Sequence, residues 1–349
     1  MAKSVRKEAA GRPARLSDVA EAAGVHVSTA SRVINGTGTL VIRPETRERI
    51  LQTAERLRYR PNAIARGLKT ASTGAIGLLI PSLRNPVLSE ITRGSFDRAY
   101  ERGYVVLLAE DSANSKALAA YERLVGEGRI DGIMVASARP ASPLLEHFAA
   151  DRVPCVFVNR RQPGSGRNIS MREEDAGRVA AQHLLSLGHQ RLAHVAGPLE
   201  LDTAGRRCAG FIAAARDAGL DAAVEAAPFD ERGGFAAMGR LMSREPAPTG
   251  VFVSNINQAV GAMAGARVAG RRVPRDVSMV GYDDDPVGEY LEAPLTTVAM
   301  PLYELGSAAV DSLIDQIEGI PPADMVLETP PRLVMRSSTA PPSVDTTTG

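Results

Sequence analysis

The residues whose types and spacing suggest chemistry lie within positions 16–35, LSDVAEAAGVHVSTASRVIN. The second half of this segment predicts a helix over 27–35 that buries Ala30, Val33 and Ile34. Its outward face then carries short side chains and one arginine, namely Val27, Ser28, Thr29, Ser31 and Arg32. Short side chains let a helix enter the major groove of DNA, where an arginine donates two hydrogen bonds to a guanine. The pattern therefore predicts DNA reading, and a helical hairpin of an ordinary α domain is the alternative.

The elements around this helix are expected to position it. Ser17 can cap a first helix through its hydroxyl, and Asp18 lies favourably in the first turn. Gly24 provides the backbone freedom that a tight turn between two helices requires. A third helix begins at 43–45, where a proline suits the first turn, and its apolar residues close a three-helix core.

The short run PNAIARGLKT, residues 61–70, follows the third helix. It has too few apolar residues for a stable isolated helix, and Gly67 weakens it further by about 1 kcal/mol relative to alanine. A helix that forms only when something holds it is suited to a ligand-dependent hinge.

Charge divides the chain into two parts. Residues 1–72 contain 14 lysines and arginines against 6 acidic residues, whereas the remainder contains 27 against 34. A basic head on an acidic body is typical of a phosphate-binding module attached to a soluble sensor. Short basic tails are also common, but these arginines are spaced through three predicted helices.

The composition sets wider limits. A chain of 349 residues is long enough for two or three domains, and an apolar content of 44% is ordinary for a globular protein. No apolar run approaches the roughly 20 residues of a membrane helix, and none follows the first basic residues as in a signal peptide. We therefore expect a cytoplasmic protein without membrane contact, in which Cys155 and Cys208 are buried thiols.

From about residue 74 onward, short apolar runs alternate with helical stretches. The first series is AIGLLIP, YVVLLAE, IDGIMVAS and PCVFVN, and the second is RLAHVAG, GVFVS and DVSMVGY. Such runs predict strands buried on both faces, and hence parallel sheets with helices outside. Two series that divide near 169–174 predict an α/β body of two similar lobes, with a ligand cleft at the carboxyl ends of the strands.

Polar residues of both signs follow these runs. They are Arg84, Asn85, Pro86, Glu110, Asp111, Ser137, Asn159 and Arg160 in the first lobe, and Thr203, Arg206, Arg207, Phe229, Asn255 and the aspartates 283–285 in the second. As a converging set they predict a site for a small polar ligand, although each alone is better explained by a helix cap or a surface loop. We expect one aspartate of 283–285 to point into the cleft and the others to cap the helix that follows.

Catalytic motifs are absent from the sequence. It contains no G-x-x-x-x-G-K, no H-E-x-x-H and no G-x-S-x-G. Its five histidines show no metal-ligand spacing with cysteines or carboxylates. We therefore expect neither an enzyme nor a cofactor. A solute-binding or enzymatic α/β protein with an incidental helical head is the competing hypothesis.

Two sets of motifs resemble one known family. The head, DVAEAAGVHVSTASRVIN followed by RPETRERILQTAERLRYRPNAIARGLK, resembles the DNA-binding region of the LacI/GalR family of bacterial transcription regulators. The body resembles the family's two-lobed effector domain, which is similar to type I periplasmic sugar-binding proteins, through GHQRLAHVAGP, RRCAGF, RRVPRDVSMVGYDD and PLTTV. The resemblance runs from about residue 16 to residue 336.

The resemblance implies roles for particular residues. Val27 and Ser28 match the family's base-reading pair, and Leu68 matches the hinge leucine that enters the minor groove at the centre of the operator. The residues expected to contact DNA are Ser17, Val27, Ser28, Thr29, Ser31, Arg32, Asn35, Asn62, Ala65, Leu68 and Lys69. Those expected to contact the effector are Asn85, Val87, Leu88, Glu110, Ser137, Asn159, Thr203, Arg207, Phe229, Asn255 and Asp283.

Several residues depart from the family's pattern. His26 stands where a serine usually caps the reading helix, which predicts a less firmly fixed start of that helix. Residues 87–88, valine and leucine, stand where sugar-binding members often carry aromatic side chains, and Ile256 replaces a frequent aspartate. A stacking surface and a carboxylate are thereby lost, so Arg207 with Arg160 can equally hold a carboxylate or a phosphate.

Together these observations predict the organisation of the chain. We expect a basic tail at 1–15, a helix-turn-helix domain at 16–60, a hinge at 61–73, a two-lobed effector and dimerisation domain at 74–340 and a polar tail at 341–349. The tail lacks a leucine heptad, which favours a homodimer over a larger assembly. The sequence thus predicts a repressor of a pseudo-palindromic DNA operator, with an operator affinity set by a small polar metabolite bound between the lobes.

Overall fold

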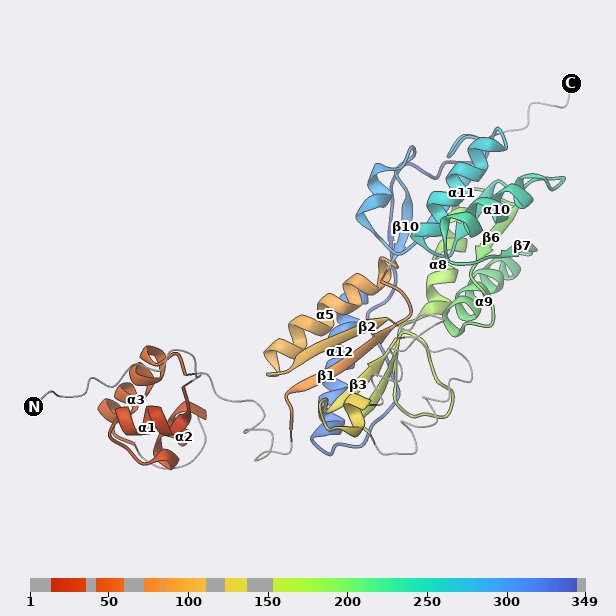
Figure 1. Ribbon diagram of the computed structural model, residues 1–349. Coiled ribbons are helices and arrows are strands. Elements are labelled where there is room, and N and C mark those ends of the chain that lie inside the picture. The colour runs from red at the N-terminus through yellow and green to blue at the C-terminus, as the bar shows by residue number, and fades with distance from the viewer. Residues whose placement is uncertain are drawn as a thin grey trace, which may run out of the picture. The chain divides into compact units, whose positions relative to one another are not determined.

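The computed structural model of the chain describes residues 14–35, 42–59, 72–83, 85–110, 123–136 and 153–343. The chain divides into two compact units, Met1–Gly74 and Ala75–Gly349 (Figure 1). The first unit contains a three-helix head, and the second contains two lobes that are each built on a six-stranded sheet. Within the described ranges, no helix has the length and apolar character needed to cross a membrane.

The head consists of α1 (Leu16–Ala22), α2 (Val27–Asn35) and α3 (Pro44–Arg56). Val19, Ala30 and Ile50 are fully buried where the three helices meet. Gly24 adopts a left-handed φ of 62° in the turn between α1 and α2, a conformation that glycine adopts without steric cost. The predicted helix pair and the third helix that closes its core are therefore confirmed.

The cap of α1 differs from the prediction. The helix begins at Leu16, which places Ser17 inside the first turn, where its hydroxyl donates to Asp18 Oδ1 at 3.4 Å. The other carboxylate oxygen of Asp18 accepts a hydrogen bond from the backbone N–H of Arg15 at 2.8 Å. Asp18 therefore caps α1 from its third position, and the prediction that Ser17 does so is wrong.

The first lobe contains a parallel sheet with the order β2–β1–β3–β4–β5–β11. Its strands are β1 (Ala75–Ile80), β2 (Val105–Glu110), β3 (Gly132–Val135), β4 (Cys155–Val158), β5 (Asn168–Ser170) and β11 (Met325–Val326). The helices α5 (Val87–Glu101) and α12 (Leu302–Ile317) pack on one face of it. As predicted, β1, β3 and β4 are buried, but β2 lies at the edge and exposes Val105, Leu107 and Leu108.

The second lobe repeats this strand order as β7–β6–β8–β9–β10–β12. Its strands are β6 (Leu192–Ala196), β7 (Ala222–Ala226), β8 (Gly250–Val253), β9 (Ser278–Tyr282), β10 (Thr296–Ala299) and β12 (Arg332–Val334), and only β12 pairs antiparallel among these described strands. One face packs against α8 (Glu173–Ser186) and α9 (Asp202–Asp217), and the other against α10 (Glu231–Met242) and α11 (Ile256–Val268). The short 3-10 helix η1 (Pro286–Tyr290) follows β9. The prediction of two similar parallel-sheet lobes is confirmed.

The chain crosses between the lobes at three places. Residues 171–172 join β5 to α8, residues 300–301 join β10 to α12, and residues 327–331 join β11 to β12. The first crossing lies within the predicted division at 169–174. The sequence did not indicate that α12 and β11 return to the first lobe, because their apolar residues follow the same patterns in either lobe.

Three helix pairs pack with their backbones in close contact at glycines. A Cβ atom added to Gly177 of α8 would lie 2.1 Å from the carbonyl oxygen of Arg207, and one added to Gly210 of α9 would lie 1.9 Å from that of Glu174. The equivalent contacts in the other two pairs are made by Gly94 of α5, Gly306 of α12, Gly234 of α10 and Gly261 of α11. Each pair is thus held at a distance that no larger residue allows.

We predict that Gly210→Ala destabilises the second lobe by about 1–3 kcal/mol, because the added methyl group must displace the backbone of α8. Gly239→Ala is the matched control, since Gly239 lies in α10 with open space around its Cα. Alanine there should leave stability unchanged or raise it by about 0.5–1 kcal/mol. Thermal unfolding of the two variants tests this, and an equal effect of both would contradict the close packing of α8 on α9.

Candidate functional site

The outward face of α2 presents the predicted DNA-reading residues. Val27, Ser28 and Arg32 are exposed, and Thr29 and Ser31 are half-buried. Ser17 is exposed on α1. Of the other predicted DNA contacts, the side chain of Asn35 and the hinge residues Asn62, Ala65, Leu68 and Lys69 lie outside the described residues.

The start of α2 is fixed by His26, contrary to the expectation of a loose start. The imidazole Nδ1 of His26 accepts a hydrogen bond from the backbone N–H of Ser28 at 3.3 Å and lies 2.8 Å from the hydroxyl of Ser28. The ring therefore performs the capping role that a serine hydroxyl otherwise performs. The contact between the ring and the hydroxyl also fixes the side chain of Ser28, which is exposed in the first turn of α2.

A cleft between the two lobes brings together most of the predicted effector residues. It encloses about 40 Å³ and is lined by Asn85, Val87, Asn159, Arg160, Met171 and Leu302 from the first lobe and its crossings, and by Thr203, Arg207, Phe229, Ser254, Asn255, Tyr282 and Asp283 from the second lobe. An open groove of about 650 Å³ adjoins the cleft and shares Val87, Asp283 and Leu302 with it. Pockets for small molecules usually measure about 300–1,000 Å³, so a sugar-sized ligand requires the lobes to move apart.

Two predicted effector residues do not line this cleft, and a third falls outside the described residues. Leu88 points away from it into the core of the first lobe, because its side chain projects about 100° around α5 from that of Val87. Glu110 ends the edge strand β2 and lies outside the cleft lining. Ser137 lies outside the described residues.

The floor of the cleft is a buried ion pair. Arg207 of α9 donates to Glu173 Oε2 of α8 through Nη2 at 2.9 Å and through Nε at 3.1 Å, and Nη1 donates to the carbonyl oxygen of Ser254 at 2.6 Å. The hydroxyl of Tyr282 donates to the same Glu173 oxygen at 2.9 Å, and the guanidinium lies 3.3 Å above the Tyr282 ring. Burial by itself lowers the pKa of Arg207, but the charge of Glu173 outweighs this effect and the pKa is raised.

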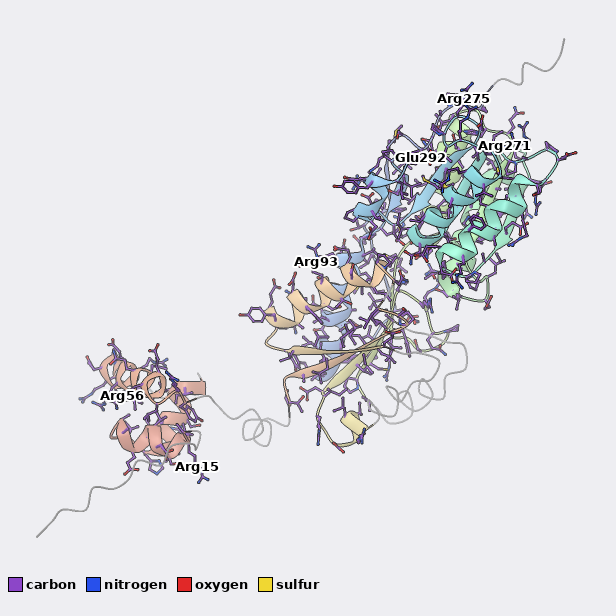
Figure 2. All side chains as sticks on the ribbon, turned by 45° about the horizontal axis from the view of Figure 1, so that its top comes forward. Arg15, Arg56, Arg93, Arg271, Arg275 and Glu292 are labelled. Carbon is purple, nitrogen blue, oxygen red and sulfur yellow. The ribbon has the colours of Figure 1, made fainter. Side chains whose placement is uncertain are left out.

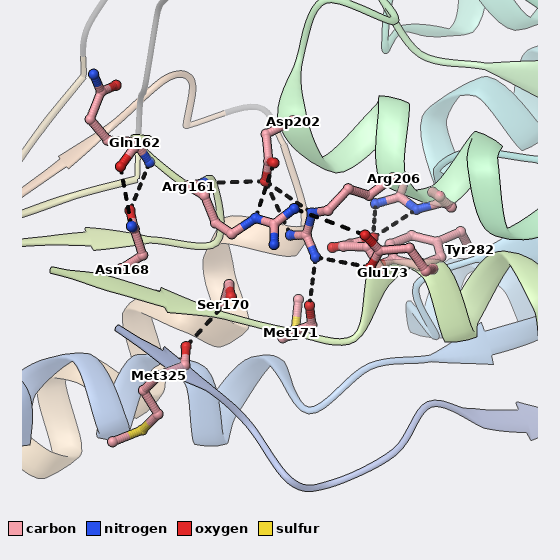
Figure 3. Close-up of polar contacts among 12 residues, drawn as sticks. Arg161, Gln162, Asn168, Ser170, Met171, Glu173, Asp202, Arg206, Tyr282 and Met325 are labelled. Atoms are coloured by element: carbon pink, nitrogen blue, oxygen red, sulfur yellow. Dashed lines mark hydrogen bonds and ion pairs between the residues drawn. The ribbon is translucent and has the colours of Figure 1, made fainter. Parts of the chain in front are cut away.

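A second group of charges lies beside this pair. Asp202 accepts from Arg161 Nε at 3.2 Å and from Arg206 Nη2 at 3.1 Å (Figure 3). Arg206 also donates to the carbonyl oxygen of Met171 at 2.9 Å, so it holds the first crossing between the lobes. The sequence predicted Arg206 and Arg207 at the cleft, but of the two only Arg207 lines it. The sequence missed Glu173 and Tyr282, which it treated only as the lobe boundary and a strand end.

Asn159 and Asp283 occupy equivalent places in the two lobes. Each follows the fourth strand of its lobe, and each has a left-handed backbone, with φ of 70° and 69° respectively. Each also has a buried Oδ1 atom without a hydrogen-bond partner among the described residues. Strained, unpaired polar groups in a cleft are typical of a ligand site, because the ligand supplies the missing partners.

The carboxyl group of Asp283 is held in its neutral form. Burial raises the pKa of Asp283 to about 8, although the charge of Arg207 opposes this. Its neighbours have structural roles: Asp285 caps η1 by accepting from the N–H of Val287 at 2.9 Å, whereas Asp284 binds Arg336 at 2.7 Å. The prediction is therefore correct for Asp283, which points into the cleft, and for Asp285, which caps the following helix. It is wrong for Asp284, which forms an ion pair instead of a cap.

The remaining lining residues are fixed by local structure. Asn255 caps α11 by accepting from the N–H of Gln258 at 2.7 Å and donates to the carbonyl oxygen of Phe229 at 3.2 Å. The Phe229 ring lies where a Cβ on Gly197 would be, 2.1 Å from ring atom Cζ, so this glycine makes room for it. Thr203 lies in the first turn of α9 and is buried.

The histidines of the second lobe are structural. His194 stacks on Phe252 at 4.7 Å between ring centroids, and burial lowers its pKa to about 3. His183 and His189 lie close to Thr339 and Ala340 in the C-terminal segment. Across the described ranges, no group of histidine, cysteine, aspartate and glutamate has the geometry of a metal site.

Comparisons with known proteins agree with this architecture. Residues 15–62 match the family model "Bacterial regulatory proteins, lacI family", and residues 181–339 match "Periplasmic binding protein-like domain". The transcriptional repressor PurR of Edwardsiella ictaluri is 32% identical over 333 residues, which cover 94% of this chain and 97% of that relative. The structure of the lac repressor dimer bound to operator and the anti-inducer ONPF is similar, with a TM-score of 0.82, 29% identity, and coverage of 94% of this chain and 100% of that one. A complex of the transcriptional regulator CelR with cellobiose aligns with a TM-score of 0.71, 30% identity, and coverage of 93% and 99%.

A helix-turn-helix head followed by a two-lobed fold similar to periplasmic binding proteins defines a class of DNA-binding transcriptional regulators. The chain belongs to the LacI family within that class. Members of this family are DNA-binding regulators and not enzymes, and the PurR relatives are repressors.

The neutral carboxyl of Asp283 predicts a pH-dependent stability. Because the folded-state pKa, about 8, exceeds the unfolded value of about 3.9, the native state holds the proton more tightly, and stability is lost as pH rises through that window. Asp283→Asn mimics the neutral form and should remove this loss. We expect the wild-type melting temperature to fall relative to that of the variant by at least about 2 °C between pH 5 and pH 8. Parallel pH profiles of the two proteins would show that the carboxyl is ionised throughout.

Proposed function

We propose that the protein is a homodimeric, sequence-specific repressor whose affinity for its operator is controlled by a small polar metabolite bound between the lobes. The observation that carries the proposal is the cleft, which both lobes line and in which the Oδ1 atoms of Asn159 and Asp283 have no hydrogen-bond partner among the described residues. A ligand with hydroxyl groups supplies the missing donors, and the arginines of the cleft suit the oxyanion of a sugar-derived acid or phosphate.

Control of DNA binding follows from a difference in ligand affinity between two arrangements of the lobes. A ligand that contacts both lobes favours one spacing of the two, and the crossings at 171–172, 300–301 and 327–331 absorb the change. Coupling of this kind amounts to about 1–3 kcal/mol, or about 5- to 150-fold in operator affinity. The proposed hinge at 61–73, of which 61–71 lie outside the described residues, connects this change to the head.

A dimer places two heads on the two halves of a pseudo-palindromic operator. The lac repressor, which is similar over nearly the whole chain, binds its operator as a dimer. Large exposed apolar side chains on α5 and β2, including Phe96, Tyr100 and Val105, provide a surface on which a second copy can pack.

We predict that Arg32→Ala lowers affinity for a selected operator by about 5- to 150-fold while it leaves non-specific binding nearly unchanged, because a base contact contributes to specific binding only. Arg56→Ala is the control: Arg56 is exposed on α3 (Figure 2), and its loss removes the same charge away from α2. Gel shifts with operator selected from a random library, and with unrelated DNA, measure both affinities. A uniform loss in both DNAs would assign Arg32 to the phosphate backbone.

We predict that Asp283→Ala retains operator binding but raises the effector concentration for half-maximal response by about tenfold or more, because it removes the carboxyl group that faces the cleft. A thermal-shift screen of sugars, sugar acids and phosphorylated metabolites identifies the effector. Asp217→Ala is the control, since Asp217 of α9 forms an exposed pair with Arg178 of α8. An unchanged dose response in Asp283→Ala would place the effector elsewhere.

A further inference from the structure

Arg160 is fixed at the edge of the cleft by the loop that follows β4. The left-handed φ of Asn159 turns the chain, and the backbone N–H of Arg160 donates to the carbonyl oxygen of Val158 at 2.8 Å. Two residues later, the N–H of Gln162 donates to Asn168 Oδ1 at 2.7 Å (Figure 3). The loop is thereby tied to the sheet on both sides of Arg160, whose side chain lines the cleft.

The other three arginines of this region each have a carboxylate partner. Arg207 binds Glu173 at 2.9 Å, and Arg206 and Arg161 bind Asp202 at 3.1 Å and 3.2 Å. Glu174 adds a third carboxylate, 3.3 Å from Arg206 and 3.9 Å from Arg161. Three guanidinium groups therefore neutralise three carboxylates in this part of the molecule.

Arg160 is left without a partner. Its guanidinium forms no hydrogen bond or ion pair with any residue in the part of the chain that the structure describes. Burial lowers the pKa of Arg160 and the charge of Arg207 lowers it further, whereas the charge of Asp202, which forms no ion pair with Arg160, raises it by a smaller amount. The carboxyl of Asp283 does not compensate, because it forms no bond to Arg160 and its raised pKa keeps it largely neutral at pH 7.

Arg160 is half-buried. An unpaired guanidinium that has lost part of its hydration destabilises a protein, and such a group persists at a site where a ligand completes it. A hydroxyl group cannot neutralise the charge, whereas a carboxylate or phosphate accepts two parallel hydrogen bonds from the guanidinium fork. The oxygens of Asn159 and Asp283, by contrast, accept from hydroxyl groups. The cleft thus offers one place for an oxyanion and at least two for hydroxyls.

Given the proposed function, we infer that the effector is a polyhydroxylated anion, whose carboxylate or phosphate group is bound by Arg160. Val87 and Leu302, which separate the cleft from the adjoining groove, have short side chains and do not provide a stacking surface for a sugar ring. The aromatic residues of the lining are Phe229 and Tyr282, and the guanidinium of Arg207 covers the Tyr282 ring. Charge and hydroxyl contacts therefore supplement a single ring, that of Phe229.

The first test needs no ligand. In extensively dialysed protein, Arg160→Met keeps the apolar stem, removes the unpaired charge and should raise the melting temperature by about 2 °C or more. Arg160→Lys keeps the charge and should melt close to wild type. Arg178→Met removes an exposed, paired arginine of the second lobe and controls for net charge. A lower melting temperature for Arg160→Met would show that Arg160 supports the fold and would overturn the inference.

The second test compares matched anions and neutral compounds at constant ionic strength. D-gluconate is paired with D-glucitol, and ribose 5-phosphate with ribose, so that the two pairs separate a carboxylate from a phosphate. We expect one anion to bind wild type at least about tenfold more tightly than its neutral partner, a preference lost in Arg160→Met and partly kept in Arg160→Lys. Inorganic phosphate alone should also raise the wild-type melting temperature more than that of Arg160→Met. Equal stabilisation of both proteins by phosphate, or a preference for the neutral compounds, would overturn the inference.

Gel shifts separate this inference from the proposed function. A neutral sugar that binds in the cleft and changes operator affinity would support the proposed function and contradict an anionic effector. An anion that binds through Arg160 without changing operator affinity would support the anion site and contradict the proposed function.

Discussion

The buried ion pair between Glu173 and Arg207 fixes the floor of the cleft and the start of α8 together. Glu173 is the first residue of α8 and follows the first crossing, while the neighbouring Arg206 holds the carbonyl oxygen of Met171 within that crossing. Burying two charges is costly, and an apolar pair of similar size is often no less stable. The contribution of this pair is positional, because Arg207 donates its hydrogen bonds to Glu173 and to the carbonyl oxygen of Ser254, and none of them goes to Asp283.

The internal repeat explains where ligand-binding groups gather. Equivalent strands β4 and β9 end in Val158 and Tyr282, and the next residue of each, Asn159 or Asp283, takes a left-handed backbone. A non-glycine residue rarely adopts this conformation, but asparagine and aspartate tolerate it best. Two lobes of the same topology therefore place a short polar side chain at the same position, one on each wall of the cleft.

Much of this arrangement was predictable from the sequence. Continuous apolar runs located the buried strands, and the residues after them supplied Asn85, Asn159, Arg207, Asn255 and Asp283 of the cleft. The inward orientation of Glu173 and Tyr282 was not predictable, because it depends on a contact across about 110 residues that only the folded sheet creates. Leu88 was assigned to the cleft from its position in the chain, but the turn of α5 places it in the core.

Local chemistry in the head was harder to predict from residue types. Ser17 is a better capping residue than arginine in general, yet the helix begins before it and Asp18 takes over. His26 is an unusual cap, and its geometry shows that an imidazole can replace a hydroxyl where the ring nitrogen reaches the Ser28 N–H. In both cases the deciding factor is where the first turn starts, which residue preferences do not determine.

The glycine contacts between paired helices have a mechanical consequence. Because α5 and α12, α8 and α9, and α10 and α11 meet backbone to backbone, none of these pairs can slide without a steric clash or loss of contact. We therefore expect these described helix pairs to deform little, and deformation to concentrate in the three short connections between the lobes. Substitutions that loosen a helix pair would allow a ligand-induced displacement to be absorbed inside a lobe. The close packing of these helix pairs therefore determines how much of that displacement reaches the neighbouring lobe.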